Sequence, residues 1–221
     1  MLHLAAITAP FYPRLAELGE FVEVQPEDMP QDYQTLLAHD DHMTVTVEAF
    51  HGSLVDVRVL QEHREGEVYT RSSLLKLQSN GHVVQLGIMR ISMQGLSAAV
   101  RGEIESRATP LGRILIRHNV MRHVKLFRLW RILPGPELVR HLGVSASVGW
   151  DEVPPEASLD FAAGGTLSQP TDSLPVSEKP AYDATVSEKP AYGVGEFIYG
   201  RSAGIVVEGR PSVELLEIVR A

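Results

Sequence analysis

Alternation of apolar and polar residues between positions 44 and 93 constrains this chain more than any other feature. The alternating segments are 44–50, 54–60, 68–77 and 83–93, and the first of them is rich in β-branched residues. Such alternation is typical of strands that bury at least one face. The Asn80-Gly81 pair between the last two segments is a strong hairpin signal, because it accepts the positive φ of a tight turn. The pattern predicts a four-stranded antiparallel meander.

The rest of the chain adds further strands and several helices to this meander. Strands are expected at 123–133, 197–199, 205–207 and 212–219, and helices at 31–39, 96–104, 136–143 and from Thr109 onward. Runs of strands followed by helices are typical of an α+β protein. We therefore expect a single antiparallel β-sheet of about six strands with helices packed on one face.

Composition divides the chain into an arm, a domain and an insertion. Residues 1–29 hold scattered prolines and are expected to form an N-terminal arm that packs on a domain spanning 30–221. Residues 145–195 are rich in Pro and Gly and predict a flexible surface insertion within that domain. The sequence of 176–182 recurs at 186–192, which indicates a local duplication. A passive loop is the favoured interpretation, and a binding motif built on its tyrosines is the alternative.

Charge and residue usage exclude several classes of function. With 221 residues, a net charge of -8 and no long basic run, the chain does not have the pattern of a general nucleic-acid binder. The absence of cysteine excludes disulfides, thiolate nucleophiles and Cys-based metal sites. The nine histidines lack the spacing of a metal site. The chain has no predicted membrane span or signal peptide, so we expect a cytoplasmic protein.

A helix start near Thr109 is a candidate anion-binding element. Thr109 is a good N-cap, and the fixed φ of Pro110 suits the first helical turn. The backbone amides around Leu111 and Gly112 would then be free of helical partners and able to hold an anion. Gly112 has no side chain that could keep a ligand from the backbone.

Four motifs in a fixed order resemble the chorismate pyruvate-lyase family, which converts chorismate to 4-hydroxybenzoate and pyruvate. They are Asp41-His42-Met43-Thr44, Tyr69-Thr70-Arg71-Ser72-Ser73-Leu74-Leu75, Thr109-Pro110-Leu111-Gly112-Arg113 and Gly209-Arg210-Pro211 with Glu217. The similarity covers roughly residues 30–145 and 195–221. It implies an α+β domain that encloses its ligand under helical flaps and catalyses an elimination without a metal or organic cofactor.

Arg71 and Glu217 are the two residues to which the resemblance assigns catalytic roles. Strand alternation places Arg71 among largely apolar neighbours, where an arginine either extends to the rim or binds an anion inside. The resemblance implies that Arg71 binds the ring carboxylate of chorismate. Alternation alone does not choose between Glu214 and Glu217, which lie on opposite faces of the last strand. The resemblance favours Glu217, as a proton donor or as a hydrogen-bond partner that orients the substrate.

The resemblance also implies a set of substrate-binding residues. The Leu111 amide, with Gly112, would receive the ring carboxylate together with Arg71, and Met43 would pack over the ring. Arg90 would be a second substrate arginine. The partners implied are chorismate and an aromatic acid product.

Two other functions remain open at this point. One is a non-catalytic, effector-sensing domain of the same fold that binds a small aromatic acid, and the other is an interaction protein acting through 176–192. The enzyme is favoured over the sensor, because no basic helix-turn-helix pattern precedes residue 30.

Overall fold

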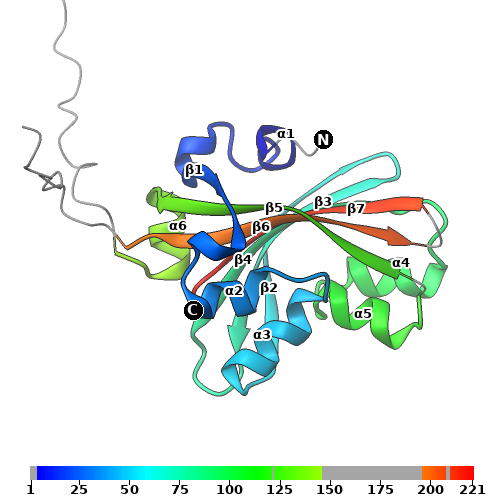
Figure 1. Cartoon of the computed structure of the whole chain (residues 1–221). Helices are drawn as coiled ribbons and strands as arrows, with labels where there is room; N and C mark the ends of the chain where they lie inside the picture. Colours follow the sequence, from blue (N-terminus) through cyan, green and yellow to red (C-terminus); the bar gives the residue numbers. More distant parts are fainter. Residues whose placement is uncertain (1–3, 121, 146–195, 208–209) are drawn as a thin grey trace, which may run out of the picture. The chain divides into compact units, whose positions relative to one another are not determined.

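The computed structural model describes residues 4–120, 122–145, 196–207 and 210–221 and contains one antiparallel sheet (Figure 1). Seven strands lie in the order β1-β5-β6-β7-β4-β3-β2. Their bounds are β1 (Gly19–Val24), β2 (Val55–Glu65), β3 (Val68–Leu77), β4 (Val83–Ser92), β5 (Arg122–Pro134), β6 (Ile198–Val207) and β7 (Arg210–Val219). The predicted α+β class with a single antiparallel sheet is confirmed.

The helices are short and cover both faces of the sheet. They are α1 (Leu4–Thr8), α2 (Gln31–Leu37), α3 (Met43–His51), α4 (Ala98–Glu105), α5 (Leu111–Arg117) and α6 (Pro136–Leu142), with 3-10 turns at Leu15–Glu17 and Pro26–Asp28. Helices α2 to α5 lie on one face, while α1 and α6 pack on the other (Figure 1). The expectation that a single face carries helices was therefore incomplete.

The central hairpin follows the sequence pattern closely. Strand β3 has the predicted bounds, and β4 pairs with it across a turn in which Gly81 has a φ of 74°. The Gly81 amide donates to the Leu77 carbonyl at 2.8 Å, which closes the turn. A glycine suits this position because it adopts positive φ without a steric penalty.

The first predicted strand of the meander is wrong, because residues 44–50 belong to helix α3. Met43, Thr44 and Val47 are buried, whereas Val45 is 48% exposed. Spacings of one and four residues place the buried side chains on one face of a helix. The helix ends at Gly52, which has a φ of 61°. Burial against the sheet thus overrides the β propensity of the threonines and valines.

The strand that the prediction lacked is β1, within residues 1–29. It pairs antiparallel with β5 at one edge of the sheet, from Gly19 opposite Pro134 to Val24 opposite Leu129. A Cβ on Gly19 would lie 2.2 Å from the Leu133 carbonyl oxygen, so the close approach of the two strands requires glycine there. The predicted insertion and its duplicated 176–192 segment fall outside the described residues, apart from Ser145 at its start.

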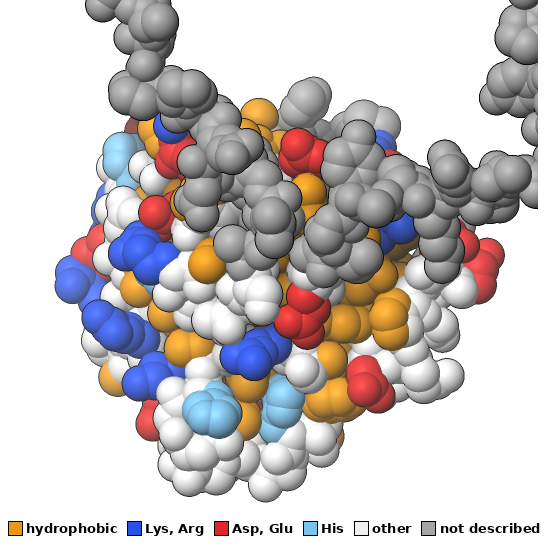
Figure 2. All heavy atoms as spheres, turned by 90° about the vertical axis from the view of Figure 1, so that its left-hand side faces the viewer, with side chains coloured by type: hydrophobic (Ala, Val, Ile, Leu, Met, Phe, Trp, Pro, Cys, Tyr) orange, Lys and Arg blue, Asp and Glu red, His pale blue; other side chains and the backbone are white. Residues whose placement is uncertain are grey.

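Alternate residues of the central strands build two separate cores. On the closed face, which we define by Leu86, Trp130, Ile132, Leu216 and Ile218, the side chains pack with α1 and α6. On the opposite side, the cavity face, one apolar cluster packs with α4 and α5 and a second packs with α2 and α3. Polar side chains lie on the cavity face between these two clusters, and they form the site described below. On the outer surface drawn in Figure 2, basic and acidic side chains are both present, with apolar ones between them.

Candidate functional site

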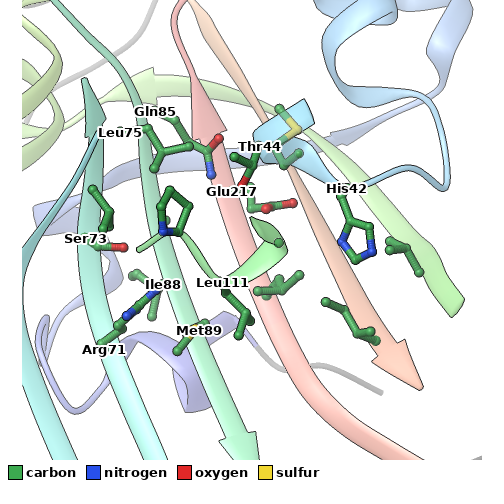
Figure 3. Close-up of a pocket in the computed structure, with 18 of the residues that line it drawn as sticks. His42, Thr44, Arg71, Ser73, Leu75, Gln85, Ile88, Met89, Leu111 and Glu217 are labelled. Atoms are coloured by element: carbon green, nitrogen blue, oxygen red, sulfur yellow. The ribbon is translucent and has the colours of Figure 1, made fainter. Parts of the chain in front are cut away.

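A cavity lies on the cavity face between the two apolar clusters (Figure 3). It measures about 60 Å³, counted as the space open to the centre of a water molecule. Strands β3, β4, β6 and β7 form its floor, and α3 and the start of α5 cover it. Its lining includes Met43, Arg71, Leu111, Gly112 and Glu217. Residues that are far apart in the sequence are therefore neighbours in one enclosed space.

Arg71 is a buried arginine that forms no ion pair with the residues that the structure describes, although the Tyr69 hydroxyl bonds to it and Glu62 attracts its charge. Its residue is 2% exposed, and within the described part of the chain its Nε and Nη1 atoms have no hydrogen-bond partner. Glu62 lies opposite Arg71 in the sheet, but its oxygens accept hydrogen bonds from the Tyr69 hydroxyl (2.9 Å) and from Arg107. Burial lowers the pKa of Arg71, although an arginine stays protonated at neutral pH.

Glu217 is held by a second arginine that the sequence analysis did not identify. Arg201 of β6 is 1% exposed and lies opposite Glu217 of β7 in the register. Its Nε donates to Glu217 Oε2 at 2.7 Å. This hydrogen bond fixes the position of the Glu217 carboxyl group in the cavity. Glu217 is therefore set up as a hydrogen-bond acceptor for a ligand.

The remaining nitrogens of Arg201 fix the segment between α2 and α3. Nη1 donates to the His39 carbonyl at 2.9 Å, and Nη2 donates to the Asp41 carbonyl at 3.0 Å. This segment leads directly into Met43, which lines the cavity. One guanidinium thus ties the floor of the cavity to its cover.

His39 acts as an acceptor in this network. Its Nδ1 receives the Asp41 amide at 3.1 Å and lies 3.3 Å from Arg201 Nη1, while Nε2 lies 2.7 Å from the Leu36 carbonyl. These contacts fit the neutral tautomer with its proton on Nε2. Burial and, next, the positive charge of Arg201 lower the pKa of His39.

Gln85 supplies a second polar group without a complete set of partners. It lines the cavity from β4 and is 5% exposed. Its Oε1 atom has no hydrogen-bond partner within the described residues. Figure 3 shows Gln85 beside Leu75, on the side of the cavity where Thr44 and Glu217 lie.

The start of α5 differs in detail from the prediction. Pro110, not Thr109, is the N-cap residue, and α5 begins at Leu111. The Thr109 hydroxyl is engaged by Glu103 instead. A Cβ on Gly112 would lie 3.0 Å from Thr44 Oγ1, so this glycine also allows α5 to approach α3 closely. Leu111 and Gly112 nevertheless line the cavity.

Arg90 is the one predicted site residue that the fold places elsewhere. It is adjacent to Met89, which lines the cavity, and therefore points to the other side of β4. Its Nη1 lies 3.3 Å from Glu214 Oε2, and both side chains are about half exposed. Strand alternation thus separates the pair Arg90 and Glu214 from the cavity residues.

The sequence around Arg201 contains a signal for a buried arginine. The expected strands at 197–199 and 205–207 left the intervening residues unassigned, whereas β6 continues through them and is buried along its length. An arginine between Gly200 and Ser202 in a buried strand requires a partner, because an unpaired buried charge is costly. Gln85 gave no comparable signal, since a strand glutamine is usually solvent-exposed.

The described residues lack two other kinds of feature. They contain no group of three or more His, Asp or Glu side chains that could hold a metal ion. They also contain no helix long and apolar enough to cross a membrane.

Comparisons with known proteins do not assign this chain to a family. No family model matches the chain, and no curated protein matches it. Among solved structures, the chain is similar to the ligand-binding domain of a protein assigned to the GntR family of transcriptional regulators from Bordetella bronchiseptica. The two are 14% identical with a TM-score of 0.40, and the match covers 76% of this chain and 85% of that one. A TM-score of 0.40 is too low to assign a function.

Proposed function

We propose that this protein binds a small ring-shaped carboxylic acid that also carries a hydroxyl group. Arg71 binds the carboxylate, and Glu217 accepts a hydrogen bond from the hydroxyl. The observation that carries the proposal is the pair of buried Arg71 nitrogens without a partner.

The energetic argument begins with Arg71. Buried charges in proteins are normally paired, because removing an ion from water costs several kcal/mol. A carboxylate fits a guanidinium with two parallel hydrogen bonds, which are stronger than neutral ones. A bound carboxylate would supply the hydrogen-bond acceptors that the Arg71 guanidinium lacks in the described part of the chain.

The spacing of the two charged residues suits a single ring. Arg71 lies opposite Met89, and Glu217 lies opposite Gly87, so the two residues are two strands and two positions apart. Strand spacing of about 4.8 Å and a rise of about 3.4 Å per residue put their Cα atoms about 12 Å apart. Both residues line the same cavity. A ring with its carboxylate and hydroxyl at opposite ends, as in 4-hydroxybenzoate, can bridge the two side chains.

The charges around the cavity favour a ligand with one negative charge. Arg201 and Glu217 neutralise one another, which leaves Arg71 as the unpaired arginine of the lining. A monoanionic hydroxybenzoate matches this single charge better than a dianion does. Binding of an aromatic acid is therefore the function that the geometry supports best.

Chorismate lyase activity is the second candidate. It is favoured by the observation that Met43, Arg71, Leu111, Gly112 and Glu217, the positions implied by the family resemblance, line one cavity. In that reaction a ring C–O bond of chorismate breaks and the adjacent ring carbon loses a proton. The ring becomes aromatic, and the released enol takes up a proton to become pyruvate. Arg71 would orient the ring carboxylate, and Glu217 would accept the hydrogen bond of the ring hydroxyl.

Calorimetric titration with 4-hydroxybenzoate tests the binding proposal. The wild-type protein should bind it, and Arg71→Met should weaken binding by about 100-fold because a charge-assisted bidentate contact is lost. Arg90→Met is the matched control, since Arg90 lies outside the cavity and its removal should leave affinity unchanged. Equal affinity of the wild type and Arg71→Met would refute the proposal.

Pyruvate release separates the two candidates. Incubation with chorismate without added cofactor should yield equal amounts of pyruvate and 4-hydroxybenzoate if the protein is a lyase. Binding of 4-hydroxybenzoate without pyruvate release would establish the non-catalytic function. Turnover that persists in both Arg71→Met and Glu217→Gln would exclude the assigned site.

A further inference from the structure

The Gln85 amide presents its nitrogen, not its oxygen, above the floor of the cavity. Gln85 lines the cavity from β4, and a Cβ at position 87 would lie 3.3 Å from Gln85 Nε2. The nitrogen therefore lies over the Gly87 backbone. The Oε1 atom is fully buried and has no hydrogen-bond partner among the described residues. Because the nitrogen of a side-chain amide donates hydrogen bonds and does not accept them, Gln85 offers a donor at this point.

Glu217 lies beside this donor and offers a hydrogen-bond acceptor. Gly87 is the register partner of Glu217, and residues directly opposite in an antiparallel pair have Cβ positions about 5 Å apart. Glu217 Oε2 accepts a hydrogen bond from Arg201, which leaves Oε1 to accept from a ligand. Figure 3 shows Gln85 and Glu217 on the same side of the cavity. One donor and one acceptor thus border the same part of the cavity.

Gly87 leaves space where a ligand would meet these two groups. Arg71 lies opposite Met89, which is two residues along β4 from Gly87. A ring held by Arg71 therefore extends over β4 toward the row of Gly87 and Glu217. Glycine has no side chain to occupy that row, so the end of the ring away from Arg71 reaches Gln85 Nε2 and Glu217 together.

A ring hydroxyl is a substituent that satisfies both groups at once. Its proton can go to Glu217, and its oxygen has lone pairs that can accept from Gln85 Nε2. An amino group of nearly the same size can donate to Glu217, but its nitrogen lone pair is delocalised into the ring and one of its protons would face Nε2. A methoxy group can accept from Nε2 but has no proton for Glu217. An amino or a methoxy compound would thus leave a buried polar group unpaired, which costs affinity.

We propose that Gln85 determines the specificity of the site by donating a hydrogen bond from Nε2 to the oxygen of a ring hydroxyl. Gln85 and Glu217 together then select a hydroxyl over an amino group at the end of the ring opposite the carboxylate. This role of Gln85 rests on the proposed function, since Arg71 must first orient the carboxylate. It goes beyond that function, because Glu217 by itself can accept a hydrogen bond from a hydroxyl or from an amino group.

Calorimetric titration of the whole chain with four benzoates tests this role of Gln85. The ligands are benzoate, 4-hydroxybenzoate, 4-aminobenzoate and 4-methoxybenzoate. We expect 4-hydroxybenzoate to bind about tenfold more tightly than 4-aminobenzoate, because only the hydroxyl satisfies both neighbours. The methoxy compound should also bind more weakly than 4-hydroxybenzoate, because it leaves Glu217 without a donor. Benzoate, which has neither a donor nor an acceptor at this position, gives the affinity due to the carboxylate and the ring.

A Gln85→Met variant tests the assignment of the residue. It preserves side-chain length and removes the amide donor, so the ratio between the affinities for 4-hydroxybenzoate and 4-aminobenzoate should fall from about ten toward one. Because Gln85 Oε1 is buried without a partner, the apolar replacement should not destabilise the fold. Gln94→Met, at an exposed glutamine in the turn after β4, is the matched control and should keep the wild-type ratio.

The outcomes distinguish the role of Gln85 from the proposed function. If none of the four compounds binds the wild-type protein, both are wrong. If 4-hydroxybenzoate binds in an Arg71-dependent way but 4-aminobenzoate binds as tightly, only the role of Gln85 is wrong, and this comparison needs no variant at position 85. A preference for the hydroxyl that Gln85→Met retains in full would come from Glu217 and would also overturn the role of Gln85.

Discussion

The two faces of the sheet treat their buried polar groups differently. On the closed face, the Tyr12 hydroxyl lies 3.2 Å from Ser72 Oγ, and Trp130 Nε1 donates to Ser202 Oγ at 3.3 Å. On the cavity face, the residue next to Ser72 is Arg71, with two nitrogens that have no partner. Ser72 and Arg71 are neighbours in β3, yet the Ser72 side chain has a hydrogen-bond partner within the protein and two Arg71 nitrogens do not.

This difference shows that the buried polar atoms without hydrogen-bond partners are concentrated at one place in the protein, and do not result from loose packing throughout it. Among the described residues, the buried side-chain atoms without a partner belong to Arg71, Gln85 and His51. Two of these three residues line the cavity, and His51 lies at the end of α3. Three of the four unpartnered buried side-chain atoms in the described part of the chain thus belong to residues of one cavity, which suits it to bind a polar ligand.

Arg201→Met should have the largest effect on stability. The substitution leaves the buried Glu217 carboxylate without its counter-ion and removes the contacts to His39 and Asp41. We expect the free energy of unfolding to fall by about 3–5 kcal/mol, the usual result of breaking a buried ion pair. Urea denaturation measures the change. A loss below about 1 kcal/mol would mean that the pair does not organise the cavity.

Ser202→Ala tests the closed face. It removes the hydroxyl that accepts from Trp130 Nε1 and should lower the free energy of unfolding by about 1 kcal/mol. Because Ser202 points away from the cavity, affinity for 4-hydroxybenzoate should remain that of the wild type. A clear loss of affinity with little loss of stability would show that the two faces are not independent.

The pH dependence of stability tests the network around His39. Its pKa is lowered in the folded protein from an ordinary value of 6.5, by burial first and then by Arg201, with Asp41 and Glu217 opposing. The unfolded chain therefore binds a proton at higher pH than the folded protein does. Stability from this group is complete above about pH 6.5 and declines as the pH falls toward the lowered folded value.

His39→Asn isolates this effect by keeping an acceptor and removing the titration. The unfolding free energy of the variant should decline less steeply below pH 6.5 than that of the wild type. The difference in slope should correspond to less than one proton taken up on unfolding. His63→Asn, at an exposed histidine of β2, is the control. Identical slopes for the wild type and His39→Asn would contradict the assigned network.

Glu214→Gln should have the smallest effect. Its partner Arg90 and Glu214 itself have side chains that are 51% and 45% exposed. Exposed pairs typically contribute less than about 1 kcal/mol. We expect no measurable change in ligand affinity and a change in unfolding free energy within about 0.5 kcal/mol. A larger loss of affinity would place this pair in the binding site after all.

The sequence predicted the parts of this site that strand alternation determines. On β3, alternation placed Arg71 among buried neighbours. On β7, alternation did not choose between Glu214 and Glu217, and the family resemblance did. That the two lie in one cavity depends on strand order, since β7 pairs with β4 although more than a hundred residues separate them. Only the family resemblance, not periodicity, linked the two residues at the sequence level.

Other features could not be predicted because tertiary contacts decide them. Residues 44–50 include several β-branched side chains, yet packing of Met43 and Val47 against the sheet makes the segment helical. The partner of Glu217 is another example, because Arg201 lies opposite Glu217 only in the register in which β6 pairs with β7. Strand β1 is a third example, because residues 19–24 form a strand through pairing with β5.

The unfolding free energy of ligand-free Arg71→Met tests the central claim most directly. If Arg71 is held unpaired for a ligand, replacing its guanidinium with an apolar side chain of similar length should leave stability unchanged or raise it by about 1 kcal/mol or more, while carboxylate binding is lost. If the variant instead loses several kcal/mol of stability, as Arg201→Met should, then Arg71 stabilises the fold through partners within the protein. That result would contradict the proposal that the cavity binds a carboxylic acid.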